Sequence, residues 1–169
     1  SSKKWVNWAL LGAVVLIFLI SLVVGNKMAS DPDEAFGGTD DAATEAAEQA
    51  GADGLLAVTP YYSLPPQDMI VDHFVAIADA TSLPVILYDI PHRTGRPIET
   101  GSLLELASHP RIRAVKDAKK DLDASSRVMA ETDLQYYSGD DAITLPLMAI
   151  GGVGVVGTST HFTGRRAHE

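Results

Sequence analysis

A lysine and a tyrosine stand at the ends of two short apolar segments in the second half of the chain. Lys116 follows Ile-Arg-Ala-Val, and Tyr88 follows Pro-Val-Ile-Leu. A lysine in an apolar segment is hard to bury in its charged form, so burial lowers its pKa and makes the neutral amine available. Such an amine can attack a carbonyl carbon and form a Schiff base. The pair therefore predicts imine chemistry, with Tyr88 moving a proton to and from the imine.

Other residues of the same region fit this chemistry, and each also has an ordinary structural interpretation. Tyr62 could continue the proton relay, although a single tyrosine is more often a packing residue with a locally bonded hydroxyl. Arg93 could hold a substrate carboxylate with its planar guanidinium, or form an ion pair at the surface. Lys116 itself could remain charged and pair with one of the aspartates that follow it. The residues alone leave these alternatives open.

These residues belong to a regular alternation of apolar and helical segments. The predicted strands cover residues 54–59, 84–90, 112–118, 134–139 and 153–159, and the predicted helices cover residues 67–81, 100–108, 121–132 and 140–150. Strands that alternate with helices indicate right-handed βαβ crossovers and a parallel sheet. We therefore predict an α/β fold, either an open doubly wound sheet or part of a barrel. In both cases the chemistry lies at the carboxyl ends of the strands.

The composition limits the classes of function. The chain has 169 residues, 13 basic and 22 acidic side chains, a net charge of −9 and no cysteine. The acidic balance argues against nucleic-acid binding, and the lack of cysteine excludes disulfides, thiolate metal sites and a cysteine nucleophile. The five histidines show no metal-ligand spacing, so we expect no metal site. The length is also short of the roughly 250 residues of a complete eight-stranded barrel.

The amino-terminal part of the chain differs from the rest. Residues 5–26 carry no charge and are almost wholly apolar, which is long enough for a membrane-spanning helix, with Trp5 and Trp8 as interfacial anchors. We predict an uncleaved single-pass anchor rather than a cleaved signal, because the apolar stretch is longer than a usual signal core. The lysines before it would place the amino terminus in the cytoplasm. Without such an anchor the protein would be cytoplasmic.

The predicted organisation has four parts. Residues 1–29 form the membrane anchor, residues 30–50 an acidic linker and helix, residues 51–164 the α/β part, and residues 165–169 a tail. Thr39 is the predicted N-cap of the helix in the second part, and Gly51 is placed to end that helix.

Four stretches of the α/β part resemble the dihydrodipicolinate synthase family of pyruvate-dependent Schiff-base aldolases. They are GADGLLAVTPYYSLPPQ, HFVAIADATSLPVILYDIPHRTG, HPRIRAVKDAKKDL and YYSGDDAITLPLMAIGGVGVV, in this order, and they lie within about residues 49–164. The resemblance implies a TIM (β/α)8 barrel that condenses pyruvate with aspartate semialdehyde in lysine biosynthesis, through a covalent imine and without a cofactor. Because the family's first three strands and last helices have no counterpart, we expect about five of the eight strands, an incomplete barrel and an impaired activity.

The resemblance also implies roles for individual residues. Lys116 matches the lysine that forms the imine with pyruvate, and Tyr88 matches a tyrosine of the proton relay. Tyr62 matches the relay tyrosine that this family lends across a dimer interface, which implies a homo-oligomer. Arg93 matches the arginine that receives the carboxylate of the aldehyde substrate.

Three further residues are expected to contact substrate on the same ground. Thr59 begins the Thr-Pro-Tyr-Tyr loop of the family. Gly152 and Val153 belong to the glycine-rich segment 151–157, which matches the last barrel strand beside the lysine.

Residues 3–50 resemble a different family, the small membrane subunit of energy-coupling cobalt transporters. In that family an apolar helix leads into an extracytoplasmic loop, and residues 34–40, Glu-Ala-Phe-Gly-Gly-Thr-Asp, match this loop. The alternative function is therefore a membrane accessory subunit for cobalt uptake, with a non-catalytic carboxy-terminal half. A chimeric chain would account for both resemblances.

Overall fold

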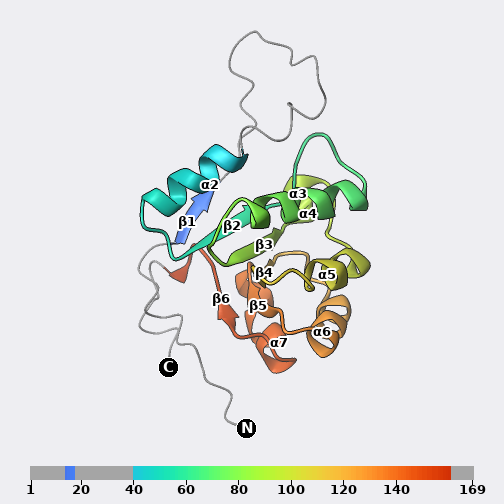
Figure 1. Cartoon of the computed structure of the whole chain (residues 1–169). Helices are drawn as coiled ribbons and strands as arrows, with labels where there is room; N and C mark the ends of the chain where they lie inside the picture. Colours follow the sequence, from blue (N-terminus) through green and yellow to red (C-terminus); the bar gives the residue numbers. More distant parts are fainter. Residues whose placement is uncertain (1–13, 18–39, 161–169) are drawn as a thin grey trace.

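The computed structural model describes residues 14–17 and 40–160, which form one parallel sheet with helices on one side (Figure 1). The sheet contains six strands in the order β1-β2-β3-β4-β5-β6, so each strand pairs with its neighbours in the chain. The strands are β1 (Val14–Ile17), β2 (Gly54–Val58), β3 (Val85–Asp89), β4 (Ile112–Asp117), β5 (Gln135–Ser138) and β6 (Gly154–Val155). Strands β2 to β6 lie within the five predicted segments, so the parallel α/β arrangement is confirmed.

Helices fill the connections between the strands. They are α2 (Asp40–Gln49), α3 (Gln67–Asp79), α4 (Pro91–Thr94), α5 (Thr100–Leu106), α6 (Leu122–Glu131), the 3-10 turn η2 (Asp141–Ile143) and α7 (Thr144–Ala149). Each predicted helix contains one of these elements, and the range 140–150 is divided between η2 and α7. The short helix α4 was not predicted. It begins at Pro91, whose ring suits the first helical position, and ends at Gly95 with a φ of 82°.

One face of the sheet packs against the helices and forms the hydrophobic core. Across β2 to β5 this face carries four buried residues in register: Ala57, Leu87, Val115 and Tyr136. Helix α3 adds the apolar stripe Ile70, Phe74 and Ile77, all of them buried. The three-to-four-residue spacing of this stripe places it on one side of the helix, as predicted. Burial of both surfaces stabilises the layer of helices on the sheet.

The opposite face carries the next row of register partners. This row, which we call the lysine row, consists of Val58, Tyr88, Lys116, Tyr137 and Gly154. Successive residues of a strand point to opposite faces, so the lysine row points away from the core row. All of its members are half-buried, whereas the core row is buried. In a closed barrel the face turned away from the helices is the interior, where side chains from neighbouring strands form layers.

Local hydrogen bonds begin and end the helices as the sequence indicates. Gly51 has a φ of 78° and follows the end of α2, which confirms its predicted place after the helix. Asp121 caps α6 by accepting a bond of 3.0 Å from the Ala124 amide. Asp140 caps η2 in the same way, since its carboxylate accepts a 3.0 Å bond from the Ala142 amide. Thr39, the predicted N-cap of α2, lies outside the described residues.

The prediction of a membrane helix is wrong at the residues that the structure describes there. Val14–Ile17 form strand β1, which pairs in parallel with β2. Hydropathy does not separate these outcomes, because a strand inside a parallel sheet is also a continuous apolar run. Among the described residues, no helix is long and apolar enough to cross a membrane. The rest of the range 5–26, and residues 30–39 of the acidic linker, lie outside the described residues.

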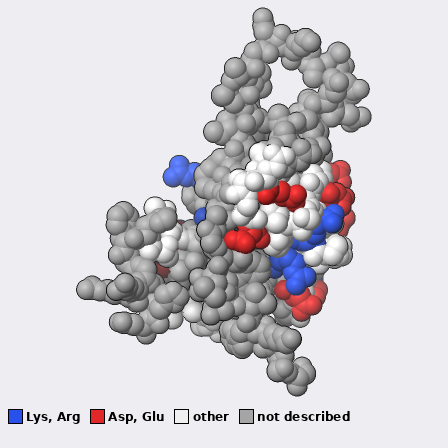
Figure 2. Space-filling model, turned by 60° about the vertical axis from the view of Figure 1, so that its left-hand side comes forward, with Lys and Arg blue, Asp and Glu red and all other residues white. Residues whose placement is uncertain are grey.

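Charged side chains of both signs share the described surface. Figure 2 shows one face, on which Lys and Arg side chains lie next to Asp and Glu side chains. Two of the ion pairs join Arg111 to Asp79 at 3.1 Å and Arg127 to Glu131 at 2.9 Å. Exposed pairs of this kind contribute little to the free energy of unfolding.

Candidate active site

Lys116 and Tyr88 lie together at the carboxyl ends of β4 and β3. The two residues are register partners in the lysine row, so their side chains leave the sheet on the same face. The Nζ atom of Lys116 lies 4.1 Å from the centre of the Tyr88 ring. An ammonium group at this distance interacts favourably with the ring face. The structure therefore brings together the predicted nucleophile and the predicted proton-transfer residue.

The surroundings of this pair alter both pKa values. Burial lowers the pKa of Lys116, which favours the neutral amine that attacks a carbonyl. Burial also raises the pKa of Tyr88, and the positive charge of Arg93 opposes this rise. A protonated phenol at neutral pH is a proton donor. The lowered lysine pKa and the raised tyrosine pKa suit a pair in which the amine is the nucleophile and the phenol supplies a proton.

Thr59 supports the tyrosine from the neighbouring strand. It follows β2, is fully buried, and its Oγ1 donates a 3.4 Å hydrogen bond to the backbone carbonyl of Tyr88. The Thr59 amide donates to the same oxygen at 3.4 Å. These contacts link the ends of β2 and β3. Substrate contact by Thr59 stays a prediction.

Arg93 stands on α4, just beyond the end of β3, and its side chain is exposed. Its positive charge acts on the Tyr88 phenol in the direction that lowers the pKa, against the effect of burial. The side chain of Thr94, next to it, is buried and donates to the carbonyls of Ile90 and Arg96 at 3.2 and 2.9 Å. An anchored loop thus presents an exposed guanidinium beside the tyrosine.

The remaining predicted residues are Tyr62, Gly152 and Val153. Tyr62 is 96% exposed, and its φ of 70° is in the left-handed region that favours glycine. Gly152 and Val153 precede β6, where the Val153 amide donates a 2.8 Å bond to the carbonyl of Tyr136. The member of β6 that stands in the lysine row is Gly154. Substrate contacts by Gly152 and Val153 therefore stay a prediction.

Tyr137 is a residue of this site that the sequence analysis did not single out. It is the register partner of Lys116 on β5, so Lys116 has a tyrosine on each side within the lysine row. Its ring is half-buried, and burial raises the pKa of its phenol. The sequence alone does not show whether Tyr136 or Tyr137 aligns with Lys116, so only the register of β5 identifies Tyr137.

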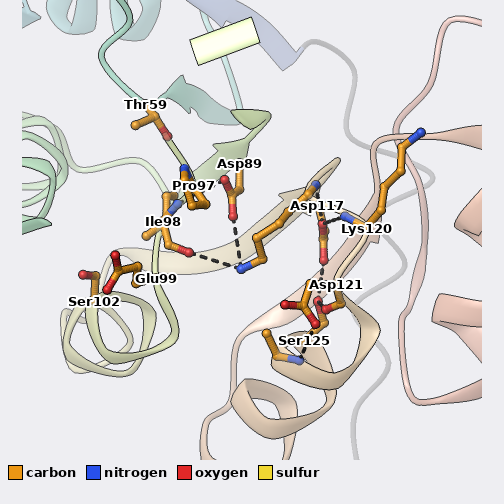
Figure 3. Close-up of polar contacts among 12 residues, drawn as sticks. Thr59, Asp89, Pro97, Ile98, Glu99, Ser102, Asp117, Lys120, Asp121 and Ser125 are labelled. Carbon is orange, nitrogen blue, oxygen red and sulfur yellow. Dashed lines mark hydrogen bonds and ion pairs between the residues drawn. The ribbon is translucent and has the colours of Figure 1, made fainter. Parts of the chain in front are cut away.

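A second group of charges lies on the helix side of the same strands (Figure 3). Asp89 and Asp117 follow Tyr88 and Lys116 in the chain and are both buried. The ammonium group of Lys119 lies 3.4 Å from the Asp89 carboxylate and donates to the carbonyl of Ile98 at 3.2 Å. Asp117 accepts bonds from the Ser125 hydroxyl and from the Lys119 amide at 2.5 and 2.8 Å.

The pKa of Asp89 reflects this environment. Burial raises its pKa from the ordinary 3.8 to about 6, while the charge of Lys119 and the Ile98 amide act in the opposite direction. Burial is therefore the larger effect. Since the two aspartates face the helices and the lysine row faces away, this cluster positions the strand ends rather than contacting a substrate at Lys116.

The described residues contain no group of three or more His, Asp or Glu side chains that could hold a metal ion. A hollow of about 360 Å³ lies beside Lys119, between residues 97–101 and the start of α6. None of the predicted site residues lines it, so the hollow is separate from the chemistry at Lys116.

Comparisons with known proteins point to one family. A model of the dihydrodipicolinate synthetase family matches residues 37–169. The 4-hydroxy-tetrahydrodipicolinate synthase of Cutibacterium acnes is 68% identical over 123 residues, which make up 73% of this chain and 42% of that protein. The family model also covers residues 37–50, which belong to the range that resembles a cobalt-transporter subunit. The comparisons give no support to that second likeness or to a membrane role.

Solved structures agree with this relationship. The DHDPS of Cyanidioschyzon merolae with lysine bound is 44% identical with a TM-score of 0.73, over 76% of this chain and 44% of that one. The chloride-inhibited dihydrodipicolinate synthase of Acinetobacter baumannii complexed with pyruvate is 36% identical with a TM-score of 0.72, over 75% and 44% of the two chains. The sheet thus matches part of a dihydrodipicolinate synthase barrel. The chain spans less than half the length of each of these relatives.

Proposed function

Because the chain belongs to the dihydrodipicolinate synthetase family, we propose that Lys116 forms a Schiff base with pyruvate and that the product condenses with aspartate semialdehyde. This is the lysine-biosynthesis reaction of a 4-hydroxy-tetrahydrodipicolinate synthase. The observation that carries the proposal is the half-buried Lys116 amine, 4.1 Å from the ring of Tyr88. The pyruvate bound to the Acinetobacter baumannii relative supports the choice of substrate.

The first step follows from the two pKa directions. The lone pair of neutral Nζ attacks the carbonyl carbon of pyruvate and forms a carbon–nitrogen bond, while the carbonyl oxygen takes up a proton. The resulting carbinolamine loses this oxygen as water and becomes an imine. Tyr88 supplies the proton to the departing oxygen and recovers one from the nitrogen, so that the phenol is unchanged after the step.

The second step needs a carbon nucleophile and an aldehyde. The imine nitrogen takes up a proton and the pyruvate methyl group loses one to a water molecule, which converts the imine into an enamine. The enamine carbon attacks the carbonyl carbon of aspartate semialdehyde, whose oxygen takes up a proton, and hydrolysis of the resulting iminium frees the Lys116 amine. The exposed guanidinium of Arg93, on the loop beyond Tyr88, is suited to hold the carboxylate of this aldehyde in a two-point contact.

A homo-oligomer is part of the proposal. Tyr62 is almost fully exposed, although a large aromatic side chain is costly to leave in water, and it is held in a left-handed backbone conformation. Both features suit a residue that contacts a second copy of the chain, where it would extend the proton relay of the partner.

Borohydride trapping tests the reaction directly. Borohydride reduces an imine to a stable secondary amine, so incubation of the full chain with pyruvate and borohydride should add the reduced pyruvate group to Lys116, located by peptide mass spectrometry. The rate should rise with pH and reach half of its maximum below 10.5, the ordinary lysine pKa, because burial favours the neutral amine.

Two variants make the result specific. Lys116→Ala should abolish the adduct. Lys120→Met is the matched control, because Lys120 is exposed, pairs with Asp140 at 2.7 Å and is not a member of the lysine row. An adduct that persists in Lys116→Ala, or no adduct in folded wild-type protein under conditions that label a full-length relative, would disprove the proposal.

A further inference from the structure

We infer that Leu64 is a positioning residue, which fastens the end of α4 so that Arg93 can hold the carboxylate of the aldehyde substrate. The inference rests on the proposed function, in which Arg93 binds that carboxylate. It adds to the site a residue from another part of the chain, the connection between β2 and α3. Its experiment separates a failure of this inference from a failure of the proposed function.

The helix that carries Arg93 needs support from other parts of the molecule. Helix α4 has only four residues, Pro91–Thr94, and a helix this short is not stable by itself in water. The Gly95 amide closes its turn by donating a 2.8 Å bond to the carbonyl of Pro91. The buried side chain of Thr94 anchors the helix from inside. The position of Arg93 therefore depends on contacts that neighbouring segments make with α4 and its end.

Leu64 makes such a contact at the residue that ends α4. A Cβ atom built on Gly95 would overlap Cδ2 of Leu64, so this methyl group lies where a larger residue 95 would carry its side chain. Gly95 also has a φ of 82°, which favours glycine. Glycine is therefore required here for two reasons, and one of them is the close approach of Leu64.

The backbone of Leu64 is strained where it makes this contact. Its φ is 47°, in the left-handed region that a branched side chain rarely adopts. The next residue is Pro65, and a residue before proline favours extended backbone instead. The side chain is 45% exposed, so its burial in a core does not account for the strain. Strain of this kind persists where surrounding contacts hold it and is concentrated at functional sites.

The contact with Gly95 bears on the chemistry through Arg93, two residues before it. A guanidinium holds a carboxylate in two parallel hydrogen bonds only when its plane is oriented, and a small misplacement weakens such a contact. Fastening the end of α4 restricts the backbone from which the Arg93 side chain extends. Lys116 and Tyr88 stand on strands of the sheet. Truncation of Leu64 should therefore weaken the binding of the aldehyde and leave the reaction with pyruvate unchanged.

Single-turnover trapping tests this role. The full chain is loaded with a limiting amount of pyruvate, aspartate semialdehyde is added, and excess borohydride stops the reaction at successive times. The rate at which the pyruvate adduct of Lys116 disappears, measured by mass spectrometry over a range of aldehyde concentrations, gives the half-saturating concentration of the aldehyde. Leu64→Ala should raise this concentration about 2-fold or more. Arg93→Ala should raise it about 10-fold or more, because the whole charged contact is lost.

Three further variants make the result specific. Met69→Ala is the matched control, because Met69 lies on α3 and is 44% exposed, which is close to the value for Leu64, and it should keep the wild-type concentration. Leu64→Met should also keep it, since a flexible apolar side chain can still cover Gly95. Leu64→Gly adopts a left-handed φ without strain, so it decides the question if the alanine variant does not fold, and it should act like Leu64→Ala.

A double variant separates positioning of Arg93 from a general effect on the fold. In the Arg93→Ala background, Leu64→Ala should add no further increase, because the guanidinium that Leu64 positions is absent. An equal increase in both backgrounds, or slower formation of the pyruvate adduct in Leu64→Ala, would overturn the inference. An unchanged half-saturating concentration in the alanine and glycine variants would overturn it as well and leave the proposed function intact. No pyruvate adduct in wild type, or an adduct that aspartate semialdehyde does not consume, would overturn both.

Discussion

At the scale of single residues, the alternation of side chains along a strand separates chemistry from support. Tyr88 and Lys116 point to the open face, while Asp89 and Asp117, one position further on, point to the helices. The first pair is half-buried, so water and a small substrate can reach it. The second pair is buried, and Lys119 and the surrounding N–H and O–H groups partly compensate its charge. The pairing of β3 with β4 therefore places a reactive pair on the open face and a supporting pair of carboxylates on the helix-covered face.

The raised pKa of Asp89 gives a prediction about stability and pH. Between its ordinary pKa of 3.8 and its folded value of about 6, the folded state binds more protons than the unfolded state. Asp89 therefore makes the protein less stable as pH rises through this window, by about 3 kcal/mol at most. The free energy of unfolding of wild type and of Asp89→Asn is measured with urea from about pH 4 to 7. The wild-type value minus the variant value should fall as pH rises and then level off.

Asp79→Asn provides a control of opposite sign. The hydrogen bond and charge of His109, with the charge of Arg111, lower the pKa of the exposed Asp79. Its contribution to stability is present above the ordinary pKa and is lost as pH falls through the lowered one. The corresponding stability difference should therefore fall towards low pH. If the difference in free energy of unfolding between wild type and Asp89→Asn also fell towards low pH, the effect of the Lys119 ion pair on the Asp89 pKa would outweigh that of burial. This result would contradict our expectation.

At the scale of elements, the start of α3 holds the loop that follows Arg93. Gln67 donates from Nε2 to the carbonyl of Pro97 at 2.9 Å. Its Oε1 accepts from the Glu99 amide at 3.0 Å and from the Ser102 hydroxyl at 2.8 Å. One side chain therefore joins α3, the loop and α5. On the other side of the loop, Asp89 accepts a 3.1 Å bond from the Ile98 amide.

Gln67→Ala should loosen this junction without removing the core. The variant leaves the amide of Glu99 and the hydroxyl of Ser102 without these partners, which should lower the free energy of unfolding by about 1–3 kcal/mol. Hydrogen exchange should become faster at residue 99 and in α5 before it changes in β3 or β4. Asp72→Ala, at an exposed position of the same helix, should leave both measurements unchanged. Equal exchange in wild type and Gln67→Ala would contradict this role.

At the scale of the whole molecule, the described sheet is one side of a barrel wall. Its helix-covered face is buried, whereas the lysine row on the other face is half-buried. Large apolar side chains are exposed at both ends of the chain segment from β2 to β6. They include Tyr61, Tyr62, Leu64, Leu145, Met148 and Val153. The surface around Tyr62 is the part that we expect a second copy to cover.

Tyr62→Ala should therefore weaken self-association. An aromatic residue at the centre of an interface commonly contributes enough for its loss to raise the dissociation constant about 10-fold or more. Sedimentation velocity over a range of concentrations measures this change. Leu145→Ala is the control, since Leu145 is 78% exposed on α7, away from the Thr-Pro-Tyr-Tyr loop. Wild-type protein that stays monomeric throughout the range would disprove the expected oligomer.

The amino-acid sequence was sufficient to predict most of the elements after residue 40 and the two central residues of the candidate site. Local patterns specify the strands β2 to β6, the helices α3, α5, α6 and α7 between them, and the end of α2 at Gly51, because each depends on residues close together in the chain. Lys116 and Tyr88 were identifiable because a reactive group at the end of an apolar strand is chemically unusual.

The tertiary structure decided what depends on neighbours across the sheet. The apolar residues 14–17 form a strand because β2 offers a parallel partner, which hydropathy cannot show. Tyr137 belongs to the site because the register of β5 places it beside Lys116, and Asp89 has a raised pKa because helices bury it. Register and burial arise from contacts between segments far apart in the chain, so they become visible only when those segments are packed together.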